Sequence, residues 1–214
     1  PLPRGKVLGG SGSINGMAYY RGHRRDYDDW AAQGLGGWSY DDLLPYFLRS
    51  EDNPQYQDSL YHHSGGPMHV SFVPRTNRLC DAFNAAMGAL GFPPCDDFNV
   101  PEPEGYGFRQ GTIERGRRVS TVSAYLRPVM HRQNLTVMTS TLVRRVLIEE
   151  GKAVAVELQT GDSVRVLRAS REIVLSAGAF HSPHILLHSG IGDQTELSAA
   201  GIEPVHHLPG VGRN

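Results

Sequence analysis

The sequence predicts an α+β fold, because a helical repeat, antiparallel hairpins and one fully apolar strand are combined in 214 residues. Apolar side chains recur at helical spacing from Leu79 to Leu90, and Gly91 follows as a stop signal. In the second half, short β-rich runs alternate with glycine-containing turns. The apolar run 173–175, followed by Gly178, is typical of a strand buried in a parallel sheet.

The β-rich part of the chain predicts an antiparallel meander. Its runs are 135–139, 143–149, 153–159 and 164–167. Hairpin turns are expected at Gly151-Lys152 and at Gly161-Asp162. A helix is then expected to begin near Ser182-Pro183, because proline favours the first turn of a helix.

Composition excludes several classes of protein. The formal net charge is −1 and no long run of one sign is present, so a nucleic-acid partner is not expected. The longest apolar runs are too short to cross a bilayer. Cys80 and Cys95 match no metal or redox spacing and are expected to be unpaired thiols. The chain begins with neither an initiator Met nor a signal-peptide pattern, so targeting information is absent or was removed. The location is therefore left unknown, with a cytoplasmic or peripheral-membrane location favoured.

The first segment that carries chemistry runs from Arg4 to Gly22 and contains the run 9–13, Gly-Gly-Ser-Gly-Ser. Backbone N–H groups and hydroxyls in such a run suit a pyrophosphate or another electron-rich ligand. A tight structural turn is the alternative interpretation of the glycines alone. The polar residues 24–30 are interpreted as a solvated helix face and not as a paired-carboxylate site.

The second such segment is 178–192, which follows the apolar strand. A strand that ends in a glycine turn has the form of a Rossmann strand, so Gly178 and Ala179 are candidates for the cofactor side. Three histidines follow at helical spacing, but no acidic residue of a zinc pattern lies between them, and no metal site is predicted. These histidines are His181, His184 and His188. The pair His62-His63, in a Ser/Gly-rich loop, is expected to be solvated.

Residues 4–22 and 178–192 together resemble, in the right order, the two signatures of the glucose-methanol-choline (GMC) oxidoreductases, which bind FAD. Residues 15–23 resemble choline and alcohol dehydrogenases more than sugar oxidases. The resemblance implies an incomplete GMC fold, with an α/β, Rossmann-like FAD-binding portion and an antiparallel substrate-side portion. The implied parts are 1–35 (FAD-binding), 36–115 (lid and substrate side) and 116–214 (FAD-binding, with the meander).

The resemblance also assigns FAD contacts by position, and it places Asn15 near the reactive edge of the flavin. Val143 matches a position whose backbone holds the adenine. Ile14 stands where some members attach the flavin covalently through histidine, so non-covalent FAD is implied. The family more often has a hydroxyl residue at the position of Gly12, and the missing hydroxyl costs at most one hydrogen bond. The implied cofactor-binding residues are Ser11, Asn15, Gly16, Met17, Ala18, Val143, Gly178 and Ala179.

The implied activity is oxidation of an alcohol to an aldehyde or ketone by hydride transfer to FAD. The acceptor that reoxidises FAD would be a quinone or another compound, with oxygen as a further possibility, and a primary alcohol with a non-oxygen acceptor is expected. The chain contains no Gly-x-Gly-x-x-Gly, which is expected upstream of Pro1, and the catalytic histidine is expected beyond Asn214. No catalytic residue is therefore assigned, and the isolated chain is expected to be inactive and not to retain FAD.

Two other functions stay open at this point. A lyase of the same family would bind FAD without redox turnover. The 214 residues could also form a stand-alone binding or structural module.

Overall fold

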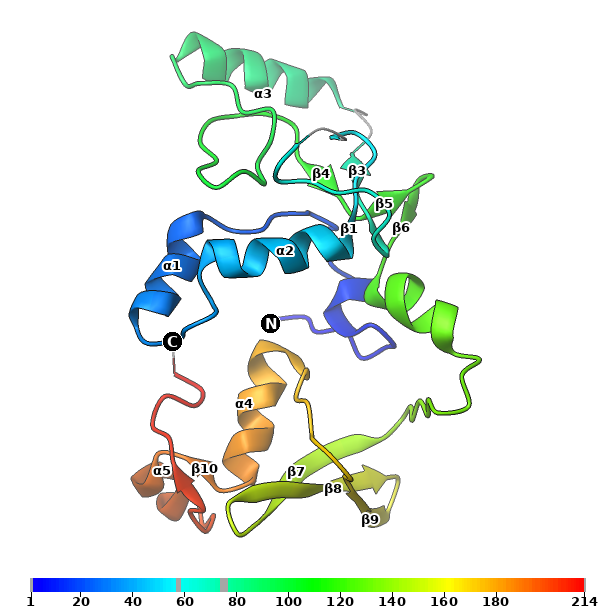
Figure 1. The fold of residues 1–214 in the computed structure, drawn as a ribbon, viewed down its shortest axis with the longest axis vertical. Coiled ribbons are helices and arrows are strands. Elements are labelled where there is room, and N and C mark those ends of the chain that lie inside the picture. Colours follow the sequence, from blue (N-terminus) through cyan, green and yellow to red (C-terminus); the bar gives the residue numbers. More distant parts are fainter. Residues whose placement is uncertain (1, 57–58, 74–76, 214) are drawn as a thin grey trace. The chain divides into compact units, whose positions relative to one another are not determined.

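The computed structural model describes residues 2–56, 59–73 and 77–213 (Figure 1). Helices and short strands are mixed along the chain, which confirms the predicted mixture of the two. The chain divides into two compact units, Pro1–Leu135 and Thr136–Asn214. The three functional parts inferred from the family resemblance stay a prediction.

Among its described residues, the first unit has three α-helices: α1 (Arg24–Ala32), α2 (Tyr40–Ser50) and α3 (Arg78–Ala89). The helix expected from Leu79 to Leu90 is thus confirmed as α3. A capping box starts α2, in which Ser39 and Asp42 satisfy each other's backbone N–H groups. Pro45 lies inside α2, which nevertheless continues for 11 residues. Proline removes a single N–H donor, and the cap and the ring contacts of α2 with Tyr27 are retained.

Six short strands in the first unit form three two-stranded pairs. The parallel pair is β1 (Glu51–Asp52) with β2 (Met68–His69). The antiparallel pairs are β3 (Ser71–Phe72) with β4 (Gln110–Gly111), and β5 (Ile113–Glu114) with β6 (Arg117–Arg118). After β6 the chain forms a π-helical turn at Val122–Leu126, which continues into a 3₁₀ turn at Arg127–Val129.

The second unit contains the expected meander, in the order β7 (Leu142–Glu149), β8 (Lys152–Thr160) and β9 (Ser163–Arg168). The first turn is Glu150-Gly151 and not Gly151-Lys152, because both of its central residues have positive φ, 49° and 74°. This conformation is a type I′ turn, which favours glycine at its second position. The second turn, at Gly161-Asp162, joins Thr160 to Ser163 as expected.

The core of the second unit lies between the meander and α4 (Gly178–His188). Val146, Ala155 and Leu158 of the sheet and Ile185 of α4 are buried. The hydroxyl of Ser189 accepts the backbone N–H of Val146 at 2.8 Å, which joins the end of α4 to the edge strand β7.

Beyond α4, the described part of the second unit contains three further elements. The short strand β10 (Ile191–Gly192) pairs in parallel with β11 (His206–His207). Between them, α5 (Gln194–Ala199) is capped by Asp193.

Three expectations for the second half are wrong in detail. Residues 135–139 and 173–175 form no strand, because no other described strand pairs with their backbone, and Val174 is 75% exposed. The helix begins at Gly178, four residues before Ser182. Gly178 has a φ of 87°, so glycine's conformational freedom turns the chain there and Pro183 lies inside the helix.

Candidate cofactor site

The glycine-rich segment forms a tight loop that contains a 3₁₀ turn, Gly10–Ser13. A Cβ atom on Gly5 would overlap the carbonyl oxygen of Gly10. Gly9 has a φ of 84°, in the region that favours glycine. The Ser11 hydroxyl accepts the N–H of Gly5 at 3.2 Å. These glycines therefore have a structural role, as the turn interpretation of the sequence proposed.

Gly16 is different, because nothing in the described part of the first unit requires a glycine there. Its φ lies outside the left-handed region, and a Cβ atom on it would meet no protein atom within 4 Å. Its neighbours Asn15 and Ala18 are exposed. A ligand lying close to the backbone explains a glycine at such a position, so the segment fits a bound cofactor.

Residues 17–19 are attached to the edge of β4. The N–H of Thr112 donates to the carbonyl of Met17 at 2.9 Å, and the N–H of Tyr19 donates to the carbonyl of Gln110 at 3.1 Å. Ala18 and Gly111 form an isolated antiparallel bridge between these bonds. The candidate cofactor residues are thus fixed by main-chain hydrogen bonds. Met17 has a φ of 58°, which is unusual for a residue with a side chain.

The side chain of Asn15 is held by two hydrogen-bond donors. Its Oδ1 accepts the N–H of Met17 at 3.0 Å and the guanidinium of Arg118 at 2.6 Å. Arg109 donates to the carbonyl of the next residue, Gly16, at 3.2 Å. Two arginines that lie on either side of the β4–β5 segment therefore hold the exposed residues 15 and 16.

The other candidate residues lie in the second unit. Val143 is on the edge strand β7, where a bulge places one extra residue, Arg144, between Val143 and Arg145. Gly178 and Ala179 open α4, whose N-cap has no side-chain hydrogen bond. The first N–H groups of this helix can therefore bind an anion such as a pyrophosphate. That both units contribute to one elongated groove stays a prediction.

The first unit also contains a buried ionic cluster. Arg21 forms an ion pair with Glu51, and His62 joins Glu51 to Asp97 through its two ring nitrogens at 2.7 and 2.8 Å. Asn53 also donates to Glu51, at 2.9 Å. The expectation that His62 is solvated is therefore wrong, whereas its neighbour His63 is exposed. The sequence around His62 does not indicate that Asp97, 35 residues away, is its partner.

The cluster changes the protonation of His62. Burial lowers the pKa of His62, but hydrogen bonds to Asp97 and Glu51 outweigh it and raise the pKa to about 9. Burial raises the pKa of Asp97, yet the hydrogen bond with His62 leaves it below its ordinary value. His62 is thus a cation at neutral pH, and each of the two cations in the cluster has a carboxylate partner.

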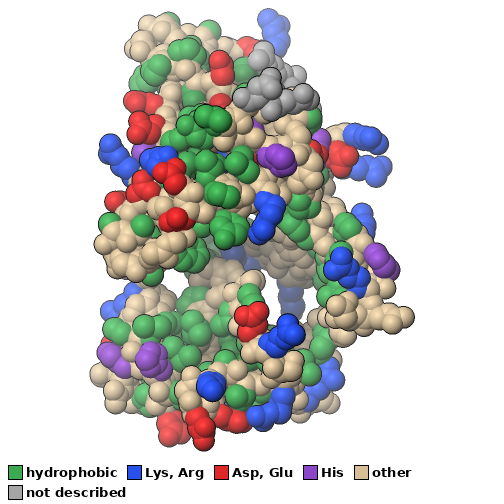
Figure 2. Space-filling view, viewed as in Figure 1, with side chains coloured by type: hydrophobic (Ala, Val, Ile, Leu, Met, Phe, Trp, Pro, Cys, Tyr) green, Lys and Arg blue, Asp and Glu red, His purple; other side chains and the backbone are tan. Residues whose placement is uncertain are grey.

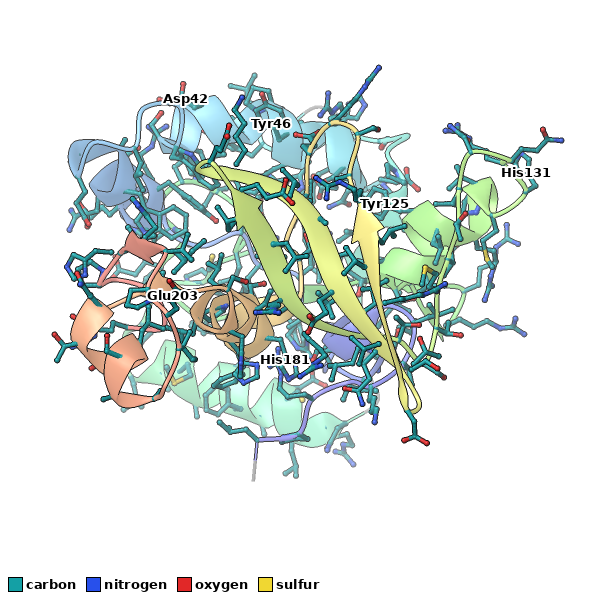
Figure 3. All side chains as sticks on the ribbon, turned by 90° about the horizontal axis from the view of Figure 1, so that it is seen from below. Asp42, Tyr46, Tyr125, His131, His181 and Glu203 are labelled. Atoms are coloured by element: carbon teal, nitrogen blue, oxygen red, sulfur yellow. The ribbon has the colours of Figure 1, made fainter. Side chains whose placement is uncertain are left out.

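Other groups singled out by the sequence lie outside this cluster. His184 and His188 approach at 3.1 Å between their Nε2 atoms, and His181 lies on the same helix (Figure 3). In the described ranges, no group of three or more possible ligands could hold a metal ion. Acidic side chains gather over α1 and α2, as expected of a solvated face (Figure 2). Cys80 and Cys95 are free thiols, as expected.

In the described part of the chain, no helix has both the length and the apolar character that crossing a bilayer requires.

Comparisons with known proteins agree over the whole chain. A family model described as GMC oxidoreductase matches residues 1–214. The oxygen-dependent choline dehydrogenase of Brucella anthropi is 44% identical over 212 residues, which are 99% of this chain and 38% of that protein.

Two solved structures are also similar. Pyridoxine 4-oxidase from Mesorbium loti matches with a TM-score of 0.89 and 35% identity, over 96% of this chain and 41% of that one. An FAD-dependent oxidoreductase from Chaetomium thermophilum matches with a TM-score of 0.90 and 30% identity, over 98% of this chain and 38% of that one. The chain thus spans about two fifths of the length of the proteins it matches.

The buried cluster predicts a pH-dependent stability. Because the pKa of His62 rises from 6.5 to about 9 on folding, its contribution is complete below pH 6.5 and is lost as pH rises through 9. That contribution is roughly 3 kcal/mol. His62→Gln should lower the thermal unfolding midpoint at pH 6.5 and flatten its decline toward pH 9. His63→Gln, at an exposed position, is the control. An unchanged decline in the His62 variant would show that another group titrates.

Proposed function

This chain belongs to the GMC oxidoreductase family, and on that premise we propose that the full-length protein oxidises an alcohol to an aldehyde or ketone with FAD. The observation that carries the proposal is the segment 15–18, in which Asn15, Gly16 and Ala18 are exposed. This segment lies in the first family signature and includes a glycine that local packing does not require. The similarity to an FAD-dependent oxidoreductase over 98% of the chain supports the same cofactor.

The finer fold assignment is part of this proposal. The apolar segment 173–175 leads into the glycine turn at Gly178 and then into α4, which is the order of a Rossmann-type strand, turn and helix. We infer that this segment becomes a strand when a neighbouring strand of the full-length protein pairs with its backbone. The short antiparallel pairs β3–β4 and β5–β6 would then belong to the substrate side.

The proposed FAD contacts are the residues that the first and second family signatures supply, together with Val143. FAD, when bound, supplies the two-electron acceptor for the alcohol. The first N–H groups of α4 would bind the pyrophosphate, and the Asn15 carboxamide would bind a polar atom of the flavin ring. Ile14 offers no nucleophile for attachment, which supports non-covalent binding. The full set is Ser11, Asn15, Gly16, Met17, Ala18, Val143, Gly178 and Ala179.

A primary alcohol is the proposed substrate, and choline is the first to test because the Brucella relative is a choline dehydrogenase. A non-oxygen acceptor, such as a quinone, was expected from the sequence and stays a prediction. Two relatives support oxygen as the acceptor instead. The Brucella relative is named an oxygen-dependent dehydrogenase, and the Mesorbium relative is named an oxidase.

We expect choline or another primary alcohol to bleach the visible absorbance of the flavin in the full-length protein under anaerobic conditions. A trimethylammonium compound without the hydroxyl is the control, because it has no C–H bond next to an oxygen to oxidise. A flavin that stays oxidised with every alcohol would favour the lyase and reject the proposal. Mixing the reduced protein separately with oxygen and with a quinone then identifies the acceptor.

Gly16→Ala tests whether FAD lies over the loop. The added Cβ meets no described protein atom, so the apoprotein should keep its unfolding midpoint. A ligand in contact with the glycine would be displaced, raising the dissociation constant of FAD about tenfold. Gly36→Ala, which is equally open and has no left-handed φ, is the matched control. Unchanged FAD affinity for Gly16→Ala would remove this loop from the site.

Acid precipitation of the full-length protein tests the mode of attachment. Flavin that stays with the precipitated protein would contradict non-covalent binding.

A further inference from the structure

The orientation of the Asn15 carboxamide follows from its partners. The N–H of Met17 and the guanidinium of Arg118 can only donate hydrogen bonds, so both must contact the oxygen of the amide. The two N–H bonds of Nδ2 then point away from these partners. Asn15 is exposed, so these donors are available to a ligand. The loop therefore offers a hydrogen-bond donor, whose direction is fixed by Arg118.

The β5–β6 hairpin determines where Arg118 lies. Arg115 and Gly116 have φ values of 48° and 74°, which is the type I′ turn that fixes a two-residue hairpin. In the resulting register Arg118 is opposite Ile113, which is buried. Successive side chains of a strand point to opposite faces, so Arg117 points away from Asn15 and is exposed. The hairpin thus brings one of two adjacent arginines to the loop.

The charge around this contact also favours a ligand rich in hydrogen-bond acceptors. Among the described residues, Arg109 and Arg118 form no ion pair with a carboxylate, and both donate to the segment 15–16. The paired cations of the buried cluster contrast with this arrangement. Two uncompensated guanidinium groups beside an exposed donor stabilise partial negative charge on a bound group.

We propose that Arg118 is a positioning residue, which holds the Asn15 carboxamide so that Nδ2 donates to an acceptor atom of the flavin ring. The acceptor is a carbonyl oxygen or an unprotonated ring nitrogen. Loss of Arg118 leaves Asn15 with the Met17 N–H alone, so the amide can rotate and the donor is no longer fixed. This inference rests on the proposed FAD-dependent function.

A double-mutant cycle in the full-length protein tests this assignment. FAD affinity is measured by flavin fluorescence on adding FAD to the apoprotein, and the absorption spectrum of the bound flavin is recorded. Arg118→Met should weaken FAD binding about 5- to 20-fold with Asn15 present. In an Asn15→Ala background the same change should weaken binding by a clearly smaller factor, about threefold at most, because only the direct effect of the Arg118 charge then remains. Arg118→Lys should restore most of the affinity, since lysine can still donate to Oδ1.

Two more variants separate donor direction from general effects. Asn15→Asp keeps the acceptor for Arg118 but removes the Nδ2 donor, so it should weaken FAD binding and shift the flavin absorption bands. Arg117→Met, on the opposite face of the same strand, should change neither.

Equal losses from Arg118→Met in both Asn15 backgrounds, or no loss at all, would overturn the positioning role. A wild-type protein that binds FAD and is reduced by alcohol while the cycle is additive contradicts only this inference. Failure of the wild type to bind FAD rejects the proposed function and the inference with it.

Discussion

The buried ion pair between Arg21 and Glu51 is the interaction on which the arrangement of the first unit depends. His62 extends it to Asp97, so one cluster joins segments that are far apart in the sequence. Removing one member would leave an unpaired buried charge, at a cost of about 3–5 kcal/mol. The cluster also reaches Gln110 through the side chain of Asn53, and the carbonyl of Gln110 binds the N–H of Tyr19. The position of the glycine-rich loop therefore depends on a cluster that includes none of the proposed FAD contacts.

The two groups of charges in the first unit have different roles. The buried cations have carboxylate partners, which satisfies the requirement for burying charge in a small core. The arginines beside residues 15 and 16 have none among the described residues, and they leave positive charge where the family resemblance places the flavin. This difference separates a structural cluster from a binding surface more clearly than the residue types alone. Arginine occurs in both settings.

Local signals predicted much of the fold. The repeat at 79–90 became α3, and turn glycines located the meander, because helix periodicity and hairpin turns depend on neighbouring residues. The strands at 135–139 and 173–175 were wrong, because a strand needs a partner for its backbone and a single apolar run does not identify one. The residues of the candidate site came from family motifs. The burial of His62 could not be predicted, because its partners Glu51 and Asp97 are separated from it by 11 and 35 residues.

Amide hydrogen exchange of the full-length protein with and without FAD tests most directly the claim that residues of both units contact FAD. We expect slower exchange on adding FAD in peptides covering 9–18, the β7 strand near Val143, and the start of α4. The hairpin tip at Gly161-Asp162, which no part of the proposed site includes, should exchange equally in both states. Protection confined to one unit, or protection of the hairpin tip alone, would contradict the claim.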